Sequence, residues 1–479
     1  MDRLSGLDAS FLYFENSAHL MHVCGLIELD ATTIPGGYNF ESMRAAMGKR
    51  LGENPAFRRK LHDHVLNLDH PVWVDDAEFD IERHVRRVSV AAPGGREELA
   101  DVCSDIAAQP MDRNRPLWEF WIIEGLPNGR LAVMTKMHHA TVDGVSGANL
   151  VSELCSLEAD APPMTPPTSA PYEEPPSDGA IILDGLVNFV AKRPVKFARI
   201  LPGTIGVLPE WVNRARSNRA MPAPFRAPRT SFNGTVTAHR STAFTQLSLD
   251  DIKLVKNTFG CTVNDVVLAV CSGALRKYLE DRNELPDTSL VAMVPVSVHG
   301  KSSAAGTNKV SGMFTKLASD VTDPEARLQA IAAQNRVSKE HHKTISASML
   351  QDWAQFAPPN TLGLAVRMYS RLRLAERHPV IHNLVISNVP GPPLPIYLMG
   401  GRIVGFYPFG PVFHGAGLNI TVISNAGHVD VGIIACREQA PHLWELADDL
   451  PGALAELVSA ARAAAGATKP KRTPRPSRV

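Results

Sequence analysis

This sequence lacks the marks of several protein classes. No apolar run in its 479 residues approaches the ~20 residues that a helix needs to cross a membrane. The six cysteines are far apart and form no Cys-x-x-Cys pair, a pattern that argues against a zinc site or a disulfide framework and fits a reducing compartment. Because 49 basic residues balance 49 acidic ones, net charge predicts neither nucleic-acid binding nor strong attraction of an anion.

The first residues, Met1 to Phe11, lack the charged and apolar regions of a secretory signal peptide. We therefore expect a cytoplasmic protein, which can still lie on a membrane surface. With 44% hydrophobic and 20% charged residues, the composition is that of a globular protein. The length exceeds the size at which one hydrophobic core keeps growing, so two domains are expected.

A proline-rich stretch divides the chain. Residues 159–178 hold seven prolines, and because proline fixes φ and lacks an N–H, this stretch is predicted to be an extended linker. The predicted domains are residues 1–158 and 241–466, joined by the linker and connector at 159–240. The basic residues at 467–479 are predicted to form a solvated tail.

Both halves mix strands with helices, which predicts the α/β class. The expected strands lie at 23–29, 130–138, 242–249, 289–298, 383–387, 419–424 and 428–435. The expected helices lie at 40–51, 96–107, 250–259, 263–280 and 441–465. The turn signal Asn425-Ala426-Gly427 predicts that the last two strands form a hairpin.

Residues 181–240 depart from the neutral average, with ten Lys/Arg against two acids. The stretch has a partly helical rhythm broken by Pro194 and Pro202. Its basic and apolar side chains include Lys192, Arg193, Lys196, Arg199, Phe189, Phe197 and Ile200. An apolar face beside basic side chains is typical of a helix that lies on an anionic membrane. A connector packed on the core accounts for the same pattern and is favoured, although both can hold.

The most informative motif is Met-His-His-Ala-Thr-Val-Asp-Gly, from Met137 to Gly144. Alternating side chains before it predict a strand that ends near the histidines, and a helical pattern follows. Histidine exchanges protons near neutrality because its ordinary pKa is ~6.5. On a strand, His138 and His139 face opposite sides, so one is expected to face the site and the other to support it.

Structural and metal-binding roles also fit a motif of this kind. An Asp-Gly turn needs no catalysis, and a single histidine such as His138 is more often a hydrogen-bonded core residue than a catalyst. No further His/Cys/Asp/Glu cluster lies nearby in the sequence, so no metal is predicted. No Gly-x-Ser-x-Gly motif appears, which argues against a serine hydrolase.

The motif resembles the HHxxxDG signature of the bacterial wax ester synthase/acyl-CoA:diacylglycerol acyltransferase family, within the superfamily of chloramphenicol acetyltransferase and condensation domains. Further segments are similar to that family from about residue 4 to 460. They are the opening Leu4–Glu15, the Pro-Leu-Trp element within Arg115–Phe120, the Asn-Asp element within Thr262–Ala269, Ile386–Pro392 and Gly417–Thr421.

The resemblance implies two chloramphenicol-acetyltransferase-like α/β domains with a substrate tunnel at their interface. It implies a long-chain acyl transfer from acyl-CoA to a hydroxyl acceptor, either diacylglycerol or a fatty alcohol or both. His139 would be the general base, supported by His138, and Asp143 and Gly144 would hold the turn. No cofactor, metal or nucleic acid is implied, and peripheral contact with the inner membrane or lipid droplets stays open.

Five further residues are candidates for substrate binding. Thr262 and Asp265 are spaced close to a helix capping box, so structure is favoured over catalysis for Asn264 and Asp265. Ser387 and Asn388, before a Pro-Gly-Pro turn, are candidate oxyanion donors. Trp118 is assigned to the core rather than to acyl contact. Two alternatives remain: an acyl donor bound to a carrier protein, and a non-catalytic lipid-binding protein of the same fold.

Overall fold

The computed structural model describes residues 2–62, 69–141, 154–161, 172–174, 176–188, 222, 225–297, 310–344 and 359–467. Several residues named above lie outside this described part. They are Asp143, Gly144, most of the proline-rich linker, residues 189–221 of the basic stretch at 181–240 and the tail from residue 468. The roles assigned to them from sequence therefore stay predictions.

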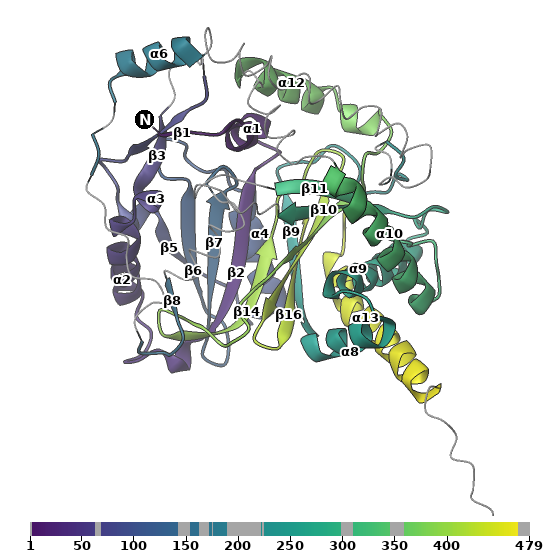
Figure 1. Cartoon of the computed structure of the whole chain (residues 1–479). Coiled ribbons are helices and arrows are strands. Elements are labelled where there is room, and N and C mark those ends of the chain that lie inside the picture. Colours follow the sequence, from purple (N-terminus) through teal and green to yellow (C-terminus); the bar gives the residue numbers. More distant parts are fainter. Residues whose placement is uncertain are drawn as a thin grey trace, which may run out of the picture.

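A seven-stranded mixed sheet forms the first half of the molecule (Figure 1). Its strands, in spatial order, are β5 (Val85–Ser89), β6 (Trp118–Glu124), β7 (Arg130–His138), β2 (His22–Asp30), β14 (Gly401–Phe409), β13 (Tyr397–Leu398) and β8 (Cys155–Ser156). The helices of this half are α1 (Gly6–Phe14), α2 (Phe40–Glu53), α3 (Pro55–Arg58), α4 (Arg96–Ala108) and α6 (Asp178–Val187). A small sheet of β1 (Asp2–Arg3), β4 (Val72–Asp75) and β3 (Arg59–His62) lies beside them.

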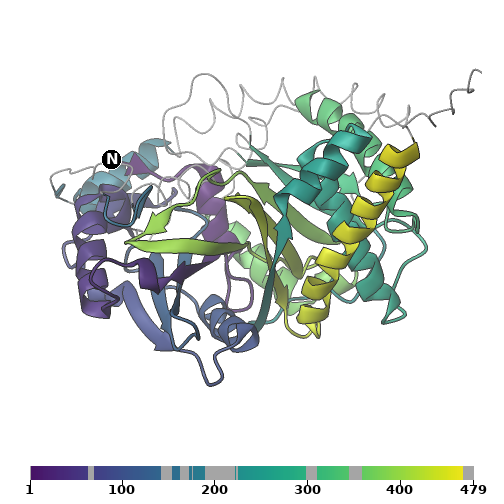
Figure 2. The ribbon, with the colours of Figure 1, turned by 90° about the horizontal axis from the view of Figure 1, so that it is seen from below.

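A six-stranded sheet forms the second half. Its strands, in spatial order, are β11 (Val310–Lys316), β10 (Val291–Ser297), β12 (Leu384–Val389), β15 (Leu418–Asn425), β16 (His428–Cys436) and β9 (Arg240–Ser248). The helices are α8 (Leu249–Phe259), α9 (Val263–Glu280), α10 (Pro324–Thr344), α12 (Pro359–Arg371) and α13 (Leu443–Ala467). Figure 2 shows α13, in yellow, along the outer side of this half. The α/β class predicted from sequence is confirmed.

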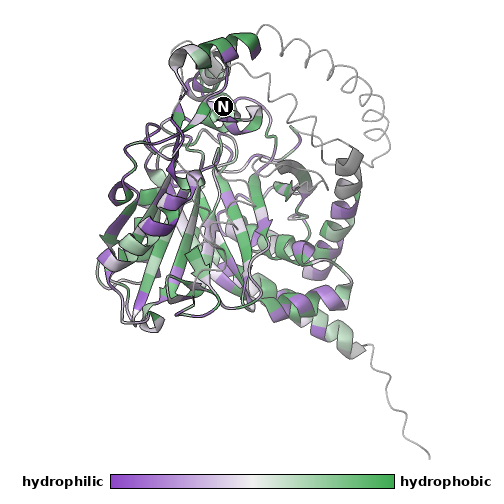
Figure 3. Ribbon diagram, turned by 60° about the vertical axis from the view of Figure 1, so that its left-hand side comes forward, coloured by the Kyte–Doolittle hydropathy of each residue, from purple (hydrophilic) through white to green (hydrophobic). Residues whose placement is uncertain are grey.

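Local sequence patterns account for most of these elements. The predicted strand at 130–138 and helix at 263–280 match β7 and α9 residue for residue. Figure 3 shows hydrophobic residues dominating the strands, while the helices alternate between hydrophobic and hydrophilic residues. Thr262 and Asp265 form the expected capping box at the start of α9. The predicted hairpin of β15 and β16 is also present.

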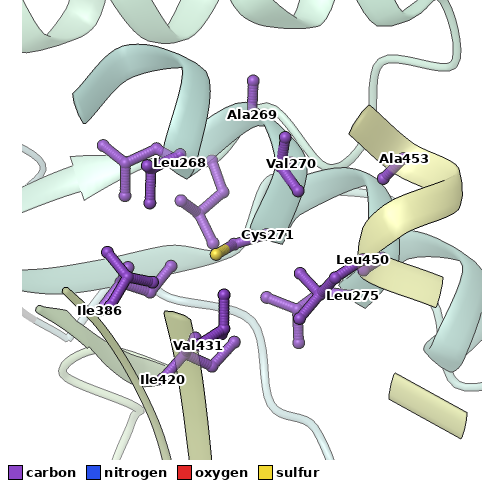
Figure 4. Packing of buried hydrophobic residues seen from close by; sticks show 14 of the residues in the cluster. Leu268, Ala269, Val270, Cys271, Leu275, Ile386, Ile420, Val431, Leu450 and Ala453 are labelled. Atoms are coloured by element: carbon purple, nitrogen blue, oxygen red, sulfur yellow. The ribbon is translucent and has the colours of Figure 1, made fainter. Parts of the chain in front are cut away.

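The largest core lies between the second sheet and its helices. Figure 4 shows Leu268 and Leu275 of α9 in this cluster with Ile420 and Val431 of the sheet and Leu450 of α13. A second core lies in the first half, between α2 and the first sheet. A third joins the halves, because Cys103 of α4 and Met134 of β7 share a cluster with Phe244 and Ile434 of the second sheet.

Strand β14 ties the two halves together. It belongs to the C-terminal half of the sequence, yet it pairs antiparallel with β2 from Arg402–Asp30 to Phe409–Cys24. Its other contacts reach the second sheet, since the Phe406 N–H donates to the buried Asp430 carboxylate at 2.7 Å. Figure 1 shows this light-green strand between purple β2 and the second sheet. The first sheet is therefore incomplete without residues near 400.

No single helix in the described ranges is long and apolar enough to cross a membrane. By length and composition α8 and α9 together pass the same test, but the pair is bent by 107° at its junction.

Candidate active site at the end of strand β7

The two histidines lie where β7 ends. His138 is the last residue of the strand and is 1% exposed, whereas His139 follows it and is partly exposed. Their backbones are anchored to different neighbours. The His138 N–H donates to the Leu117 carbonyl at 3.0 Å, and the His139 N–H donates to the Met21 carbonyl at 2.7 Å. His138 is therefore fully buried, whereas His139 keeps part of its surface exposed although its Nδ1 atom is buried.

Helix α1 and the residue that directly follows it contact the two rings. The ring of Phe11 stacks on the ring of His139 with centroids 4.1 Å apart. Glu15 directly follows the helix, and its Oε2 lies 3.4 Å from the Nε2 of His138. Ser5 begins the helix by accepting a hydrogen bond from the Asp8 N–H at 3.1 Å. The position of α1 thus sets the surroundings of both histidines.

The contacts of His138 fix which of its ring nitrogens carries a proton. The Ala140 N–H donates to Nδ1 at 3.0 Å, so Nδ1 acts as an acceptor. In a neutral imidazole the proton is then on Nε2, the atom that faces Glu15. The Thr141 hydroxyl donates to the His138 carbonyl at 2.7 Å. His138 is held from both sides, which suits a supporting residue.

Glu15 also contacts a third histidine and an arginine. His22 of β2 is paired with His138 of β7 in the sheet register, so both side chains lie on the same face. The Nε2 of His22 is 3.2 Å from Oε1 of Glu15. Arg113 donates to Oε2 of Glu15 at 2.6 Å and to the Leu12 carbonyl at 2.9 Å. A partly buried carboxylate therefore joins two imidazoles and a guanidinium.

Burial and charge shift the pKa values of these groups. Burial would raise the pKa of Glu15, but the interactions with His138 and His22 outweigh it and hold the pKa well below its usual value. Burial lowers the pKa of His22 to about 4, with Lys136 adding to the effect and Glu15 opposing it. Burial likewise lowers the pKa of His139 to about 4. Both of these imidazoles are therefore neutral at pH 7.

The segment between α1 and β2 brings the site to the boundary between the halves. Arg240 of β9 donates to the Ala18 carbonyl at 2.6 Å. The ring of His19 lies 5.1 Å from the ring of His414, which belongs to the C-terminal half. Met21, at the end of the same segment, accepts the His139 N–H. His139 is thus close to the junction of the two halves.

Trp118 lies in the core of the first half. It is 2% exposed, its indole N–H donates to the Phe57 carbonyl at 2.7 Å, and its ring stacks on His84 at 4.4 Å. One edge of its side chain also lines a pocket of about 310 Å³ that contains Arg83, Arg86 and Arg115. The polar atom of the indole ring is satisfied within the protein.

The C-terminal candidates form a separate group. The Asp265 carboxylate accepts from the Thr262 N–H at 2.9 Å and from the buried Asn335 amide at 2.6 Å. The Asn388 amide lies 3.4 Å from the Asn264 amide oxygen, and Asn388 lines a pocket of about 290 Å³. Ser387 precedes it on β12, in register with Thr421.

Sequence reasoning missed Glu15, His22 and Arg113. The sequence offered no further His/Cys/Asp/Glu cluster close to the pair, whereas in the structure Glu15 and His22 lie beside His138. Glu15 and His22 are more than 100 positions away in the chain, so no local spacing joins them to the pair. The available signal was that Glu15 ends the opening segment that resembles the family. Within the described residues, no group of three or more His, Cys, Asp or Glu has an arrangement that could hold a metal ion.

Two family models match most of the chain. The wax ester synthase/diacylglycerol acyltransferase catalytic domain matches residues 4–267, and the C-terminal domain of the same family matches residues 306–458. A putative diacylglycerol O-acyltransferase of Mycobacterium tuberculosis is 48% identical over 463 residues, covering 96% of this chain and 90% of that protein. A probable diacylglycerol O-acyltransferase of the same organism is 37% identical, covering 96% of this chain and 99% of that protein.

Solved structures agree with these matches. A wax ester synthase/diacylglycerol acyltransferase from Marinobacter aquaeolei VT8 has a TM-score of 0.70 and 29% identity, covering 96% of this chain and 100% of that chain. A condensation domain of a calcium-dependent antibiotic synthetase, at 12% identity and a TM-score of 0.57, shares the two-domain fold. The chain therefore belongs to the wax ester synthase/diacylglycerol acyltransferase family, and it is an acyltransferase.

Proposed function

We propose that this protein transfers a long-chain acyl group from acyl-CoA to the hydroxyl group of diacylglycerol, a fatty alcohol or both. Family membership supports the reaction class. The observation that carries the proposal is the partly exposed His139 at the end of β7, whose imidazole is neutral at pH 7 and lies near the junction of the halves. A tunnel between the halves would bring the two substrates to this ring from opposite sides.

In the proposed mechanism, His139 removes the proton from the acceptor hydroxyl. An alcohol is a poor nucleophile at neutral pH, so a positioned base contributes about 10²–10⁴-fold in rate. The alkoxide attacks the thioester carbonyl, and the tetrahedral intermediate then releases the CoA thiolate. The thiolate takes the proton back from His139, so no acyl-enzyme forms. Holding both substrates in one channel supplies orientation as well.

The groups around His139 are proposed to position the base. The carboxylate of Glu15 faces the Nε2 of His138 at 3.4 Å, and the Ala140 N–H donates to the Nδ1 of the same ring. Because His138 directly precedes His139, a fixed His138 ring fixes the backbone that carries the base. Asp143 and Gly144 are proposed to hold the turn that follows His139, as the family resemblance implies. His138 and Glu15 are therefore positioning residues rather than catalytic ones.

The proposed partners are acyl-CoA, a hydroxyl acceptor and a lipid surface touched peripherally from the cytoplasm. The triacylglycerol or wax ester product is almost insoluble, so a protein that makes it needs contact with a lipid phase. The basic stretch proposed for this contact from sequence lies mainly outside the described residues. Its first helix, α6, is described and exposes Leu183 and Leu186.

One assay tests the proposal. Purified protein is incubated with labelled palmitoyl-CoA and either diolein or hexadecanol, and the products are separated by chromatography. We expect a labelled ester with at least one acceptor, and a His139→Ala variant with kcat lowered by about 10²–10⁴-fold and an unchanged melting temperature. No ester with free acyl-CoA would favour a carrier-bound donor or a lipid-binding protein. Near-normal turnover by a folded His139→Ala variant would remove His139 as the base.

A further inference from the structure

Exposed large hydrophobic side chains gather at one end of the molecule. In the described part of the chain, seven of them lie on α1, α6 and α12 or directly follow α12: Phe14, Leu183, Leu186, Val187, Leu364, Met368 and Leu372. Figure 1 shows α6 and α12 at its upper edge and α1 below them. Single exposed apolar residues are normal on protein surfaces, but a group confined to one end indicates an interaction surface.

Helix α12 carries the most regular part of this group. Leu364, Met368 and Leu372 are spaced four residues apart, so they form one stripe along the helix, and they are 52%, 52% and 45% exposed. The helix already has a packing contact on another side. It packs against α1, where a Cβ atom added to Gly363 would lie 3.8 Å from the Tyr13 carbonyl oxygen. The stripe is therefore a second apolar face with no role in the core.

Positive charge accompanies the stripe. Helix α12 contains no Asp or Glu, and Arg367 and Arg371, also four residues apart, are exposed beside the stripe. Neither arginine forms an ion pair in the part of the chain that the structure describes. Apolar side chains flanked by arginines are the pattern of a helix that lies at the surface of an anionic membrane. A second copy of the chain fits less well, because pairing two stripes would bring like charges together.

We propose that α12 binds an anionic lipid surface, with Leu364, Met368 and Leu372 among the acyl chains and Arg367 and Arg371 at the headgroups. The consequence for the site follows from packing. Helix α12 rests on α1, whose Phe11 stacks on His139. Glu15, directly after α1, contacts His138. The lipid surface is then next to the helix that holds the base. This inference rests on the proposed function only in naming the lipid as the source of the acceptor.

Vesicle binding tests the inference without using activity. The full chain is sedimented with vesicles of phosphatidylglycerol and phosphatidylcholine, or of phosphatidylcholine alone, at low and high salt. One variant combines Leu364→Glu, Met368→Glu and Leu372→Glu, and a second combines Arg367→Glu and Arg371→Glu. The matched control combines Leu157→Glu and Leu254→Glu, which are also exposed but lie near β8 and on α8, at the other end of the molecule. Melting temperatures verify that each variant is folded.

We expect salt-sensitive binding of the wild type and the control to the anionic vesicles. The stripe variant should bind at least about tenfold more weakly, and the arginine variant about 30-fold more weakly. Equal binding by the stripe variant and the wild type overturns the inference, as does a wild type that binds no vesicles. Light scattering that shows self-association dependent on the stripe, without vesicle binding, assigns the face to a second copy instead.

Activity separates this inference from the proposed function. With an acceptor dispersed in detergent, the stripe variant should transfer acyl groups as fast as the wild type while failing to bind vesicles. A wild type that binds vesicles but makes no ester contradicts the proposed function and leaves the binding inference standing. A wild type that makes ester from dispersed acceptor but binds no vesicles supports the proposed function and overturns the binding inference.

Discussion

At the scale of single residues, the pKa of His139 sets the pH range over which the proposed base is available. Burial lowers this pKa from its usual 6.5 to about 4. Because kcat/KM reports ionisations of the free enzyme, we expect its acid limb near pH 4 rather than near 6.5. The measurement uses a short-chain soluble acceptor from about pH 3 to 8, with tryptophan fluorescence recorded at each pH to verify folding. An acid limb near 6.5 in folded protein contradicts this prediction.

Glu15 offers a second test at this scale. Changing Glu15→Gln keeps the shape of the side chain but removes the charge beside the Nε2 of His138. We expect kcat to fall by about 10–100-fold with little change in KM, because the base is positioned less well. Steady-state kinetics at pH 7.5 provide the readout. Arg113→Gln, which leaves the carboxylate in place, is the matched control and should lose less activity.

The same variant has a signature in acid that a purely steric role lacks. The pKa of Glu15 is lowered on folding, so its contribution to stability is fully present above its unfolded value near 4.5. That contribution is lost as the pH falls below 4.5 towards the folded pKa. Urea unfolding at pH 5 and pH 3.5 should therefore show a smaller loss of stability in Glu15→Gln than in the wild type. Equal losses of unfolding free energy in the two proteins would show that charge interactions do not stabilise the Glu15 carboxylate in the folded state.

At the scale of elements, the capping box of α9 separates a structural role from a catalytic one. Asp265→Ala leaves the Thr262 N–H and the buried Asn335 amide without their acceptor. We expect the free energy of unfolding to fall by about 2–4 kcal/mol while kcat per folded molecule stays the same. Asn264→Ala, which keeps the capping box, should lose less than about 1 kcal/mol. Normal stability with lost turnover in Asp265→Ala would instead make it a direct participant.

Local elements were predictable because their causes are local. The capping residues and the apolar pattern that define α9 lie within the helix, and alternation along β7 predicts its end at His138. Strand β14 was not predicted, since Pro408 argues against a central strand. The structure accommodates this proline because β13 pairs with β14 only at Gly401 and Arg402. The end of β14 that contains Pro408 therefore has one hydrogen-bonded neighbour in the sheet, β2.

The candidate site was predictable only in part, because some of its residues are joined by local sequence and others only by long-range contacts. The motif around His139 is continuous in sequence, so its chemistry could be recognised. Glu15 and His22 reach His138 only through the pairing of β2 with β7 and the packing of α1. Neither of these long-range contacts produces a recognisable residue spacing in the sequence. The exposed apolar face of α12 was also missed, because the sequence pattern assigned the expected lipid contact to the basic stretch at residues 181–240.

At the scale of the whole molecule, the exchange of β14 predicts that the two halves do not fold alone. A fragment of residues 1–240 lacks β14 and leaves the edge of β2 unpaired, along with part of two cores. We expect this fragment and its complement to be insoluble when expressed separately. Expressed together, they should give a soluble complex with acyltransferase activity. A soluble fragment of residues 1–240 with a cooperative thermal transition would contradict this expectation.

The position of β14 also has a consequence for synthesis. Asp30 pairs with Arg402, so β2 leaves the ribosome long before its partner strand has been made. At about 5–20 residues per second, the wait is roughly 20–70 s. During that time the edge of β2 is open to pairing with other nascent chains. The rate at which the C-terminal half is translated therefore sets how long each new molecule is exposed to aggregation.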